Sequence, residues 1–121
     1  MASKMDSLYR VYLFKVKFQE KDEVKERPIV TFIYDNQTFS FEVLGVYSQK
    51  YKYKNNPYYK NFMYKIRDYK EAGLKFPSYI NVARPFSIPF TVLINKSSFG
   101  KLTDYDVKKL IALYNQYWSN K

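Results

Sequence analysis

The sequence predicts a mainly β protein, a small barrel or half-barrel closed by one helix packed at the C-terminal end. From residue 12 to residue 94, apolar and polar residues alternate in several short segments, which is typical of strands with one buried face. After residue 103 the apolar spacing changes to three and four residues, which indicates an amphipathic helix. Several strands followed by one helix favour an α+β architecture. A chain of 121 residues is expected to form a single domain, 1–121, with a core from roughly 10 to 118.

The predicted strands are short, and the first three are expected to form a meander. A tight turn at 35–37 joins the second strand to the third, because Asn and Asp tolerate left-handed backbone. Pro77, Pro85 and Pro89 keep the later strands short or place them at sheet edges. The expected strands are 12–18, 29–34, 39–43, 62–69, 78–82 and 88–94.

The C-terminal helix is predicted from its first turn and from its apolar stripe. Thr103 is a suitable N-cap, and Asp104 and Asp106 place carboxylates at the positive end of the helix dipole. Trp118 is expected to belong to the core or to an interface. The stripe consists of Val107, Leu110, Ile111, Tyr114 and Trp118.

Composition excludes several kinds of chemistry. The chain has no histidine and no cysteine, so imidazole and thiolate catalysis are excluded, and no metal or cofactor is expected. The absence of cysteine and of an apolar leader fits the cytoplasm. A net charge of +10 indicates a polyanionic partner such as RNA, DNA, an acidic protein or a membrane surface.

The positive charge is concentrated between Glu42 and Asp68, where no acidic residue occurs. Lysines for phosphate contacts alternate there with tyrosines that could stack on unpaired bases, as in a groove for single-stranded nucleic acid. The same Lys/Tyr-rich composition is also expected of an ordinary solvent-exposed hairpin in a protein encoded by an AT-biased genome. The basic residues are Lys50, Lys52, Lys54, Lys60, Lys65 and Arg67. The residues predicted to bind RNA are Lys50, Tyr51, Lys52, Tyr53, Lys54, Lys60 and, further along, Arg84.

Two residues are candidates for catalysis. Arg27, fixed by Pro28 where the charged segment 19–26 runs into the strand 29–34, could donate two parallel hydrogen bonds to a phosphate. It could also simply pair with Glu23 or Glu26. Ser48 opens the basic stretch, where a hydroxyl would face the bound molecule, although a lone serine is usually a turn residue.

The order of these motifs resembles the MazF/PemK family of toxin endoribonucleases. The similar segments span roughly residues 10–113. They are RVYL at 10–13, ERPIVT at 26–31, VYSQK at 46–50, FPSYIN at 76–81, Arg84, and GKLTD at 100–104. The chain departs from the family at Tyr9-Arg10, where Gly-Asp is common, at Ser48, where Thr is commoner, and at Pro85, where Thr often follows the arginine.

The resemblance implies an SH3-like barrel that forms a homodimer and is the toxin of a type II toxin-antitoxin module. Such a protein cuts single-stranded RNA, messenger RNA above all, without a metal, leaving 2′,3′-cyclic phosphate and 5′-OH ends. The family's active-site arginine and hydroxyl correspond to Arg27 and Ser48, and the partner would be a cognate antitoxin. Two alternatives stay open: a non-catalytic barrel that binds single-stranded nucleic acid, and a gyrase-poisoning toxin that uses the helix around Trp118.

Overall fold

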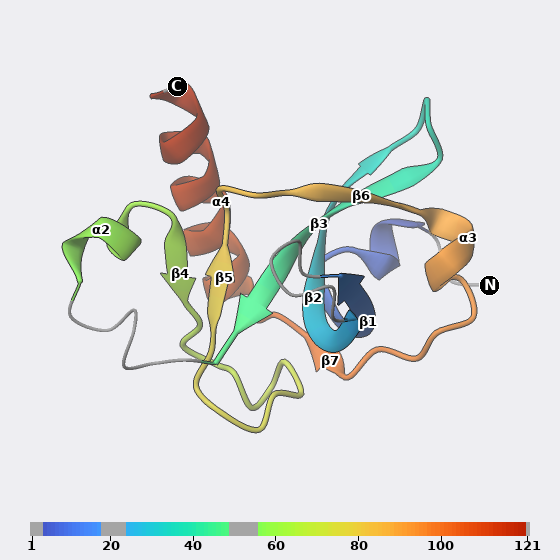
Figure 1. Ribbon diagram of the computed structural model, residues 1–121, viewed down its shortest axis with the longest axis horizontal. Coiled ribbons are helices and arrows are strands. Elements are labelled where there is room, and N and C mark those ends of the chain that lie inside the picture. The colour runs from blue at the N-terminus through green and yellow to red at the C-terminus, as the bar shows by residue number, and fades with distance from the viewer. Residues whose placement is uncertain (1–3, 18–23, 49–55, 121) are drawn as a thin grey trace.

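The computed structural model describes residues 4–17, 24–48 and 56–120, and it is mainly β (Figure 1). In the described residues, seven antiparallel strands form one curled sheet, and a long C-terminal helix packs against it. The strands follow the order β4-β5-β3-β2-β1-β7, with β6 also paired to β3. No strand pair within the described ranges joins β4 to β7, so the sheet is a half-barrel rather than a closed barrel. The predicted fold class is confirmed.

The strands are longest in the N-terminal meander. They are β1 Arg10–Lys17, β2 Val24–Asp35, β3 Ser40–Tyr47, β4 Met63–Lys65, β5 Tyr79–Asn81, β6 Phe86–Pro89 and β7 Gly100–Lys101.

The helices differ greatly in length. η1 is Lys4–Ser7, α2 is Pro57–Lys60, α3 is Phe90–Leu93 and α4 is Asp104–Ser119. In Figure 1, α4 lies beside β4 and β5, whereas α3 lies at the other end of the molecule. No helix within the described segments combines the length and apolarity that crossing a membrane requires.

Alternation along the strands divides the sheet into two faces. On the α4 face, Val30, Leu44 and Val46 pack in one cluster with Leu110 of α4. Residues that alternate with these, such as Ile29 and Val43, point to the opposite face. There they pack with Leu8, just after η1, and Leu93 of α3. The opposite face is therefore covered by η1 and α3 at one end only.

The predicted start of the second strand is wrong. β2 begins at Val24 rather than at residue 29, and β1 pairs with its first seven residues, from Lys17 opposite Val24 to Val11 opposite Val30. The Arg27-Pro28 pair thus lies within a strand and does not mark the junction of a loop and a strand. Pairing of β2 with β3 begins only at the following residue, Ile29, so Pro28 lies at the limit of that ladder, where a missing N–H is tolerated.

Three other strand predictions have wrong ends, and the one at 39–43 also stops short of Tyr47, where β3 ends. Phe39 belongs to the turn before β3, with a φ of 52°, and its side chain is 56% exposed. The strand predicted at 62–69 is only β4, because the chain turns away after Lys65. The strand predicted at 88–94 ends at Pro89, and the next four residues form α3. A proline fits the start of a helix but ends a ladder, since it has no N–H to donate.

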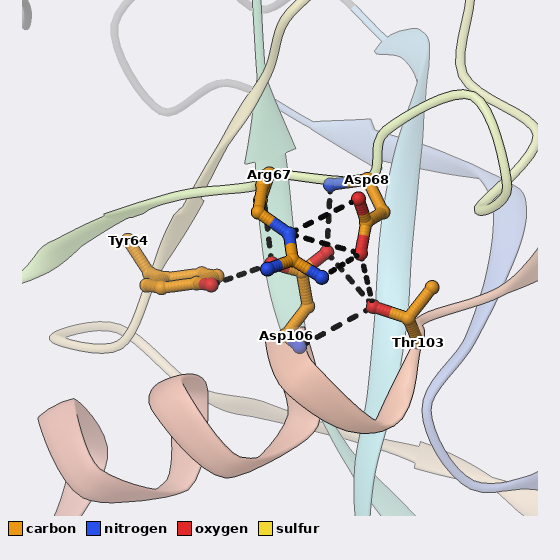
Figure 2. A network of polar contacts seen from close by, with 5 residues as sticks. All are labelled: Tyr64, Arg67, Asp68, Thr103 and Asp106. Atoms are coloured by element: carbon orange, nitrogen blue, oxygen red, sulfur yellow. Dashed lines mark hydrogen bonds and ion pairs between the residues drawn. The ribbon is translucent and has the colours of Figure 1, made fainter.

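A buried carboxylate connects the start of α4 to the chain after β4 (Figure 2). Thr103 caps α4 by accepting a hydrogen bond from the Asp106 amide, as predicted. Asp106, however, is completely buried, and it accepts hydrogen bonds from the amides of Arg67 (3.0 Å) and Asp68 (2.9 Å) and from the Tyr64 hydroxyl (2.5 Å). Burial, and then this last hydrogen bond, raise the pKa of Tyr64 well above its usual value. Asp106 therefore joins two segments of the chain, beyond any interaction with the helix dipole.

Candidate functional site

Arg27 lies on the face of the sheet opposite α4. It pairs with Phe14 of β1, and its neighbour Ile29 packs in the cluster under η1 and α3. The guanidinium carbon lies 5.3 Å from the centre of the Tyr47 ring, a distance at which a cation is attracted to an aromatic face. Arg27 is half-buried, so its stem is held while part of the side chain stays accessible. A guanidinium held in this way is pre-oriented for a planar anion such as phosphate.

Gly45 lets the Tyr47 ring lie close to β3. A Cβ placed on Gly45 would be 3.1 Å from the Tyr47 ring and hydroxyl, closer than most carbon contacts in proteins. The two residues are on the same side of the strand, because side chains alternate with a period of two. The absence of a side chain at Gly45 thus leaves room for the ring on which the Arg27 guanidinium lies.

Ser48 is the residue directly after β3, and it is exposed. The Arg27–Tyr47 contact continues the β2–β3 register, in which Ile29 pairs with Gly45. The two candidate catalytic residues therefore lie on neighbouring strands at the same end of the sheet, one position out of register. Among the contacts of the described residues, no hydrogen bond joins Arg27 to Ser48.

An aromatic cluster extends from Tyr47 toward α2. Tyr47 pairs with Tyr79 of β5, and both pack with Met63 of β4 and with Tyr59 and Phe62. The rings of Tyr59 and Phe62 meet edge to face with their centres 5.7 Å apart. This cluster covers the part of the opposite face that η1 and α3 leave free, and it connects the Arg27 end of the sheet to α2.

The predicted RNA-binding residues are only partly placed by the structure. Lys60 is exposed at the last position of α2, next to the aromatic cluster, and Arg84 is exposed in the connection between β5 and β6. Trp118 holds that connection to α4, since its indole nitrogen donates to the Val82 carbonyl at 2.9 Å. Lys50, Tyr51, Lys52, Tyr53 and Lys54 lie outside the described residues.

Arg67, which follows β4, is already engaged in contacts within the protein. Arg67 forms an ion pair with Asp68 at 3.0 Å, and its guanidinium carbon lies 3.5 Å from the centre of the Tyr105 ring in α4. It is therefore engaged in joining α4 to the sheet. Arg67 hence contributes more to structure than to an anion-binding surface.

The site combines a fixed cation, an exposed hydroxyl and aromatic surface. Such a set can bind a phosphate and stabilise negative charge that develops on it. Within residues 4–17, 24–48 and 56–120, no three carboxylates come close enough together to share a metal ion.

Sequence reasoning missed the partner of Arg27. The sequence offers one signal for it, because a Gly followed two positions later by a Tyr, as at Gly45 and Tyr47, leaves room for a ring over the backbone. The contact itself depends on the register between β2 and β3, which single-strand patterns do not give.

Comparisons with known proteins support the fold. No protein-family model matches the chain, and no curated protein matches it in sequence. Its structure is similar to a chain in the crystal structure of MazE-MazF (Form-II) from Deinococcus radiodurans, with a TM-score of 0.66. The similarity covers 95% of this chain and 96% of that chain, at 10% sequence identity. The curled half-barrel with its C-terminal helix is thus a MazF-like fold.

Proposed function

We propose that the protein is the toxin of a type II toxin-antitoxin module and acts as a metal-independent endoribonuclease on single-stranded RNA, messenger RNA above all. The observation that carries the proposal is the Arg27 guanidinium held on Tyr47 at the end of a MazF-like sheet away from η1 and α3, next to the exposed Ser48. Both predicted catalytic residues are present at this end of the sheet.

The chemistry requires little more than alignment and charge stabilisation. The RNA 2′-oxygen attacks the adjacent phosphorus while the bond to the 5′-oxygen breaks, leaving a 2′,3′-cyclic phosphate and a 5′-OH. The 2′-OH loses one proton and the 5′-oxygen gains one, so no co-reactant is consumed. Arg27 donates to the phosphorane oxygens, where charge develops, and the Ser48 hydroxyl holds a further phosphate oxygen. Because a guanidinium stays protonated in proteins, Arg27 does not act as the base.

The test is cleavage of a single-stranded RNA in the presence of EDTA by the wild type and by Arg27→Ala, Arg27→Lys and Ser48→Ala. We expect Arg27→Ala to lower kcat by about 10²–10³, as for the loss of one oxyanion donor. Arg27→Lys keeps the charge but loses the planar fork, so its activity should be intermediate. Ser87→Ala, which removes an exposed strand hydroxyl from β6, is the matched control for Ser48→Ala.

The outcomes separate the proposal from its alternatives. Wild type that binds RNA in a salt-dependent manner but cuts none would contradict the endoribonuclease and favour a silent binding barrel. Cleavage that both alanine variants retain would refute the assigned site.

We also propose an antitoxin partner with an acidic segment that lies across the Arg27 end of the sheet. The net charge of +10 would steer such a segment to the site. An antitoxin and RNA should then compete, and simultaneous binding of both would refute this arrangement.

The active form is proposed to be a homodimer. In the apolar stripe of α4, Leu110 is completely buried in the core, whereas Trp118 is exposed. A second group of exposed apolar side chains lies around α3 and the β2–β3 turn, at Phe39, Val92 and Ile94, and we propose that this group forms the contact surface. Light scattering at micromolar concentration should give a dimer, and Ile94→Glu should weaken it; a wild-type monomer would contradict the proposal.

A further inference from the structure

The strand registers place four side chains in one row across the sheet. Tyr47 of β3 pairs with Tyr79 of β5, and Tyr79 pairs with Lys65 of β4. Directly paired residues of antiparallel strands point to the same face. The Arg27 guanidinium lies on Tyr47 at the other side of the same row. The row therefore runs from one cation, through two tyrosines, to a second cation.

The direction of Lys65 follows independently from its neighbours in β4. The Tyr64 hydroxyl donates to Asp106 on the α4 face (Figure 2). Met63 packs with Tyr79 in the aromatic cluster on the opposite face. Because side chains alternate along a strand, Lys65 points to the same face as Met63, which is also the face of Arg27.

Lys65 is available to a ligand. Its side chain is exposed, and its ammonium group has no hydrogen bond or ion pair to another residue in the part of the chain that the structure describes. The paired strand β5 has no acidic residue, and Glu42 of β3, one strand further, accepts a hydrogen bond from Tyr114 of α4 and so faces the other side of the sheet. Among the basic residues after β3, Lys65 thus differs from Arg67, which is already paired with Asp68.

The length of the row matches an extended polyanion rather than a single phosphate. Neighbouring strands are about 4.8 Å apart, so three steps from β2 to β4 separate the two cations by about 14 Å. One phosphate cannot contact both. A single-stranded nucleic acid lying across the strands would present one phosphate to Arg27 and a later one to Lys65.

We infer that Lys65 binds a phosphate of the substrate RNA at a distance of a few nucleotides from the bond that is cut. The inference rests on the proposed function and adds to it a second anchoring point, which sets how the RNA crosses the sheet. Lys65 is a substrate-positioning residue. It contacts the bound chain but none of the reacting atoms.

The experiment compares Lys65→Ala with Lys101→Ala, a closely matched control. Both lysines are exposed and are the last residues of the two edge strands, β4 and β7, at opposite edges of the sheet. Both substitutions change the net charge equally. Cleavage of a set of RNA oligonucleotides of increasing length is measured with EDTA, together with RNA binding as a function of salt concentration.

Loss of one phosphate contact has a defined size. For single strands the logarithm of affinity falls by about 0.7 per contact for each tenfold rise in salt, which is about fivefold between 0.1 M and 1 M. We expect Lys65→Ala to raise KM about fivefold at 0.1 M salt with kcat unchanged, and to reduce the salt slope by about 0.7. Lys65→Arg should retain wild-type KM, as should Lys101→Ala. The effect should vanish for oligonucleotides too short to span about 14 Å.

Each outcome supports or overturns a separate statement. If the wild type cuts RNA but Lys65→Ala has the same KM and salt slope as Lys101→Ala, the assignment of Lys65 is refuted while the endoribonuclease stands. A loss that is equal for short and long oligonucleotides also refutes it. If the wild type binds RNA without cutting it, the endoribonuclease is refuted. A reduced salt slope in Lys65→Ala would then still support a phosphate contact at Lys65, and an unchanged slope would refute it. Wild type that neither cuts nor binds RNA overturns both.

Discussion

Replacing Asp106 with alanine should be among the most destabilising single changes in the protein. The carboxylate is completely buried and accepts hydrogen bonds from two backbone amides and the Tyr64 hydroxyl (Figure 2). Alanine leaves these three donors without an acceptor in a buried site. Each unpaired buried donor lowers the free energy of unfolding by about 1–3 kcal/mol. Because water gains partial access to the opened site, we expect a total loss of about 3–5 kcal/mol.

The control for this change is in the same helical turn. Asp104 also lies in the first turn of α4, but its side chain is exposed, so Asp104→Ala should alter the free energy of unfolding by about 0.5 kcal/mol or less. Both variants lose one carboxylate near the helix N-terminus, so the loss of its interaction with the helix dipole is similar in the two and does not contribute to the difference between them.

The assay is urea unfolding followed by circular dichroism, with the midpoint of thermal unfolding as a second measurement. For a domain of this size, a loss of 3–5 kcal/mol lowers the Tm by about 10 °C or more. If Asp106→Ala unfolds within about 1 kcal/mol of Asp104→Ala, the buried network does not hold α4 to the sheet, and our reasoning is wrong. Since Asp106 lies in α4, on one face of the sheet, and Arg27 points to the opposite face, RNA cleavage per folded molecule should be unchanged.

Three further predictions concern the backbone and pH. Gly45→Ala should displace the Tyr47 ring by a few tenths of an ångström and lower the rate of RNA cleavage severalfold without unfolding the protein. In an Arg27→Ala background the same substitution should cause no further loss of cleavage. Equal losses in both backgrounds would argue against coupling through the ring. Gly73→Ala should lower the free energy of unfolding by more than about 1 kcal/mol, because its φ is +83° and a Cβ would meet a carbonyl oxygen at 2.3 Å; an unchanged urea midpoint would contradict this. The hydrogen bond from Arg67 holds the pKa of Asp68 below its usual range, so this carboxylate stabilises the fold above about pH 4, and its contribution is lost as the pH falls through the lowered value. In Asp68→Asn, the free energy of unfolding should therefore fall less steeply as the pH is lowered below about 4. An unchanged pH dependence would show that other carboxylates determine the loss of stability in acid.

Local signals were sufficient for α4. Thr103 as N-cap and the apolar stripe through Leu110 depend on residues within one or two helical turns of each other, and the structure confirms both. The meander was also predictable, because alternation marks a strand with one buried face wherever the face is apolar. In these segments, local preference and tertiary packing favour the same structure.

Sequence patterns failed where pairing rather than burial makes the strand. The charged start of β2 has no apolar alternation, and it is a strand because β1 lies beside it from Lys17 onward. β7 has two residues and pairs only with Arg10 and Val11, so it is too short to show a strand pattern in the sequence. The short helix α3 forms after Pro89, where the apolar run suggested that a strand continues. All three depend on contacts between residues far apart in the sequence.

The candidate site was half predictable for the same reason. The Arg-Pro motif singled out Arg27, but the ring that holds its guanidinium depends on the register between β2 and β3. That register is determined by the core: Leu44 and Val46 must face α4, so Gly45 and Tyr47 must face the other side. A slip of one residue would bury Tyr47 against α4 and expose Val46. The apolar residues of β3 therefore determine where the functional side chains point, and substitutions in the core that shift this register should abolish the site without touching Arg27.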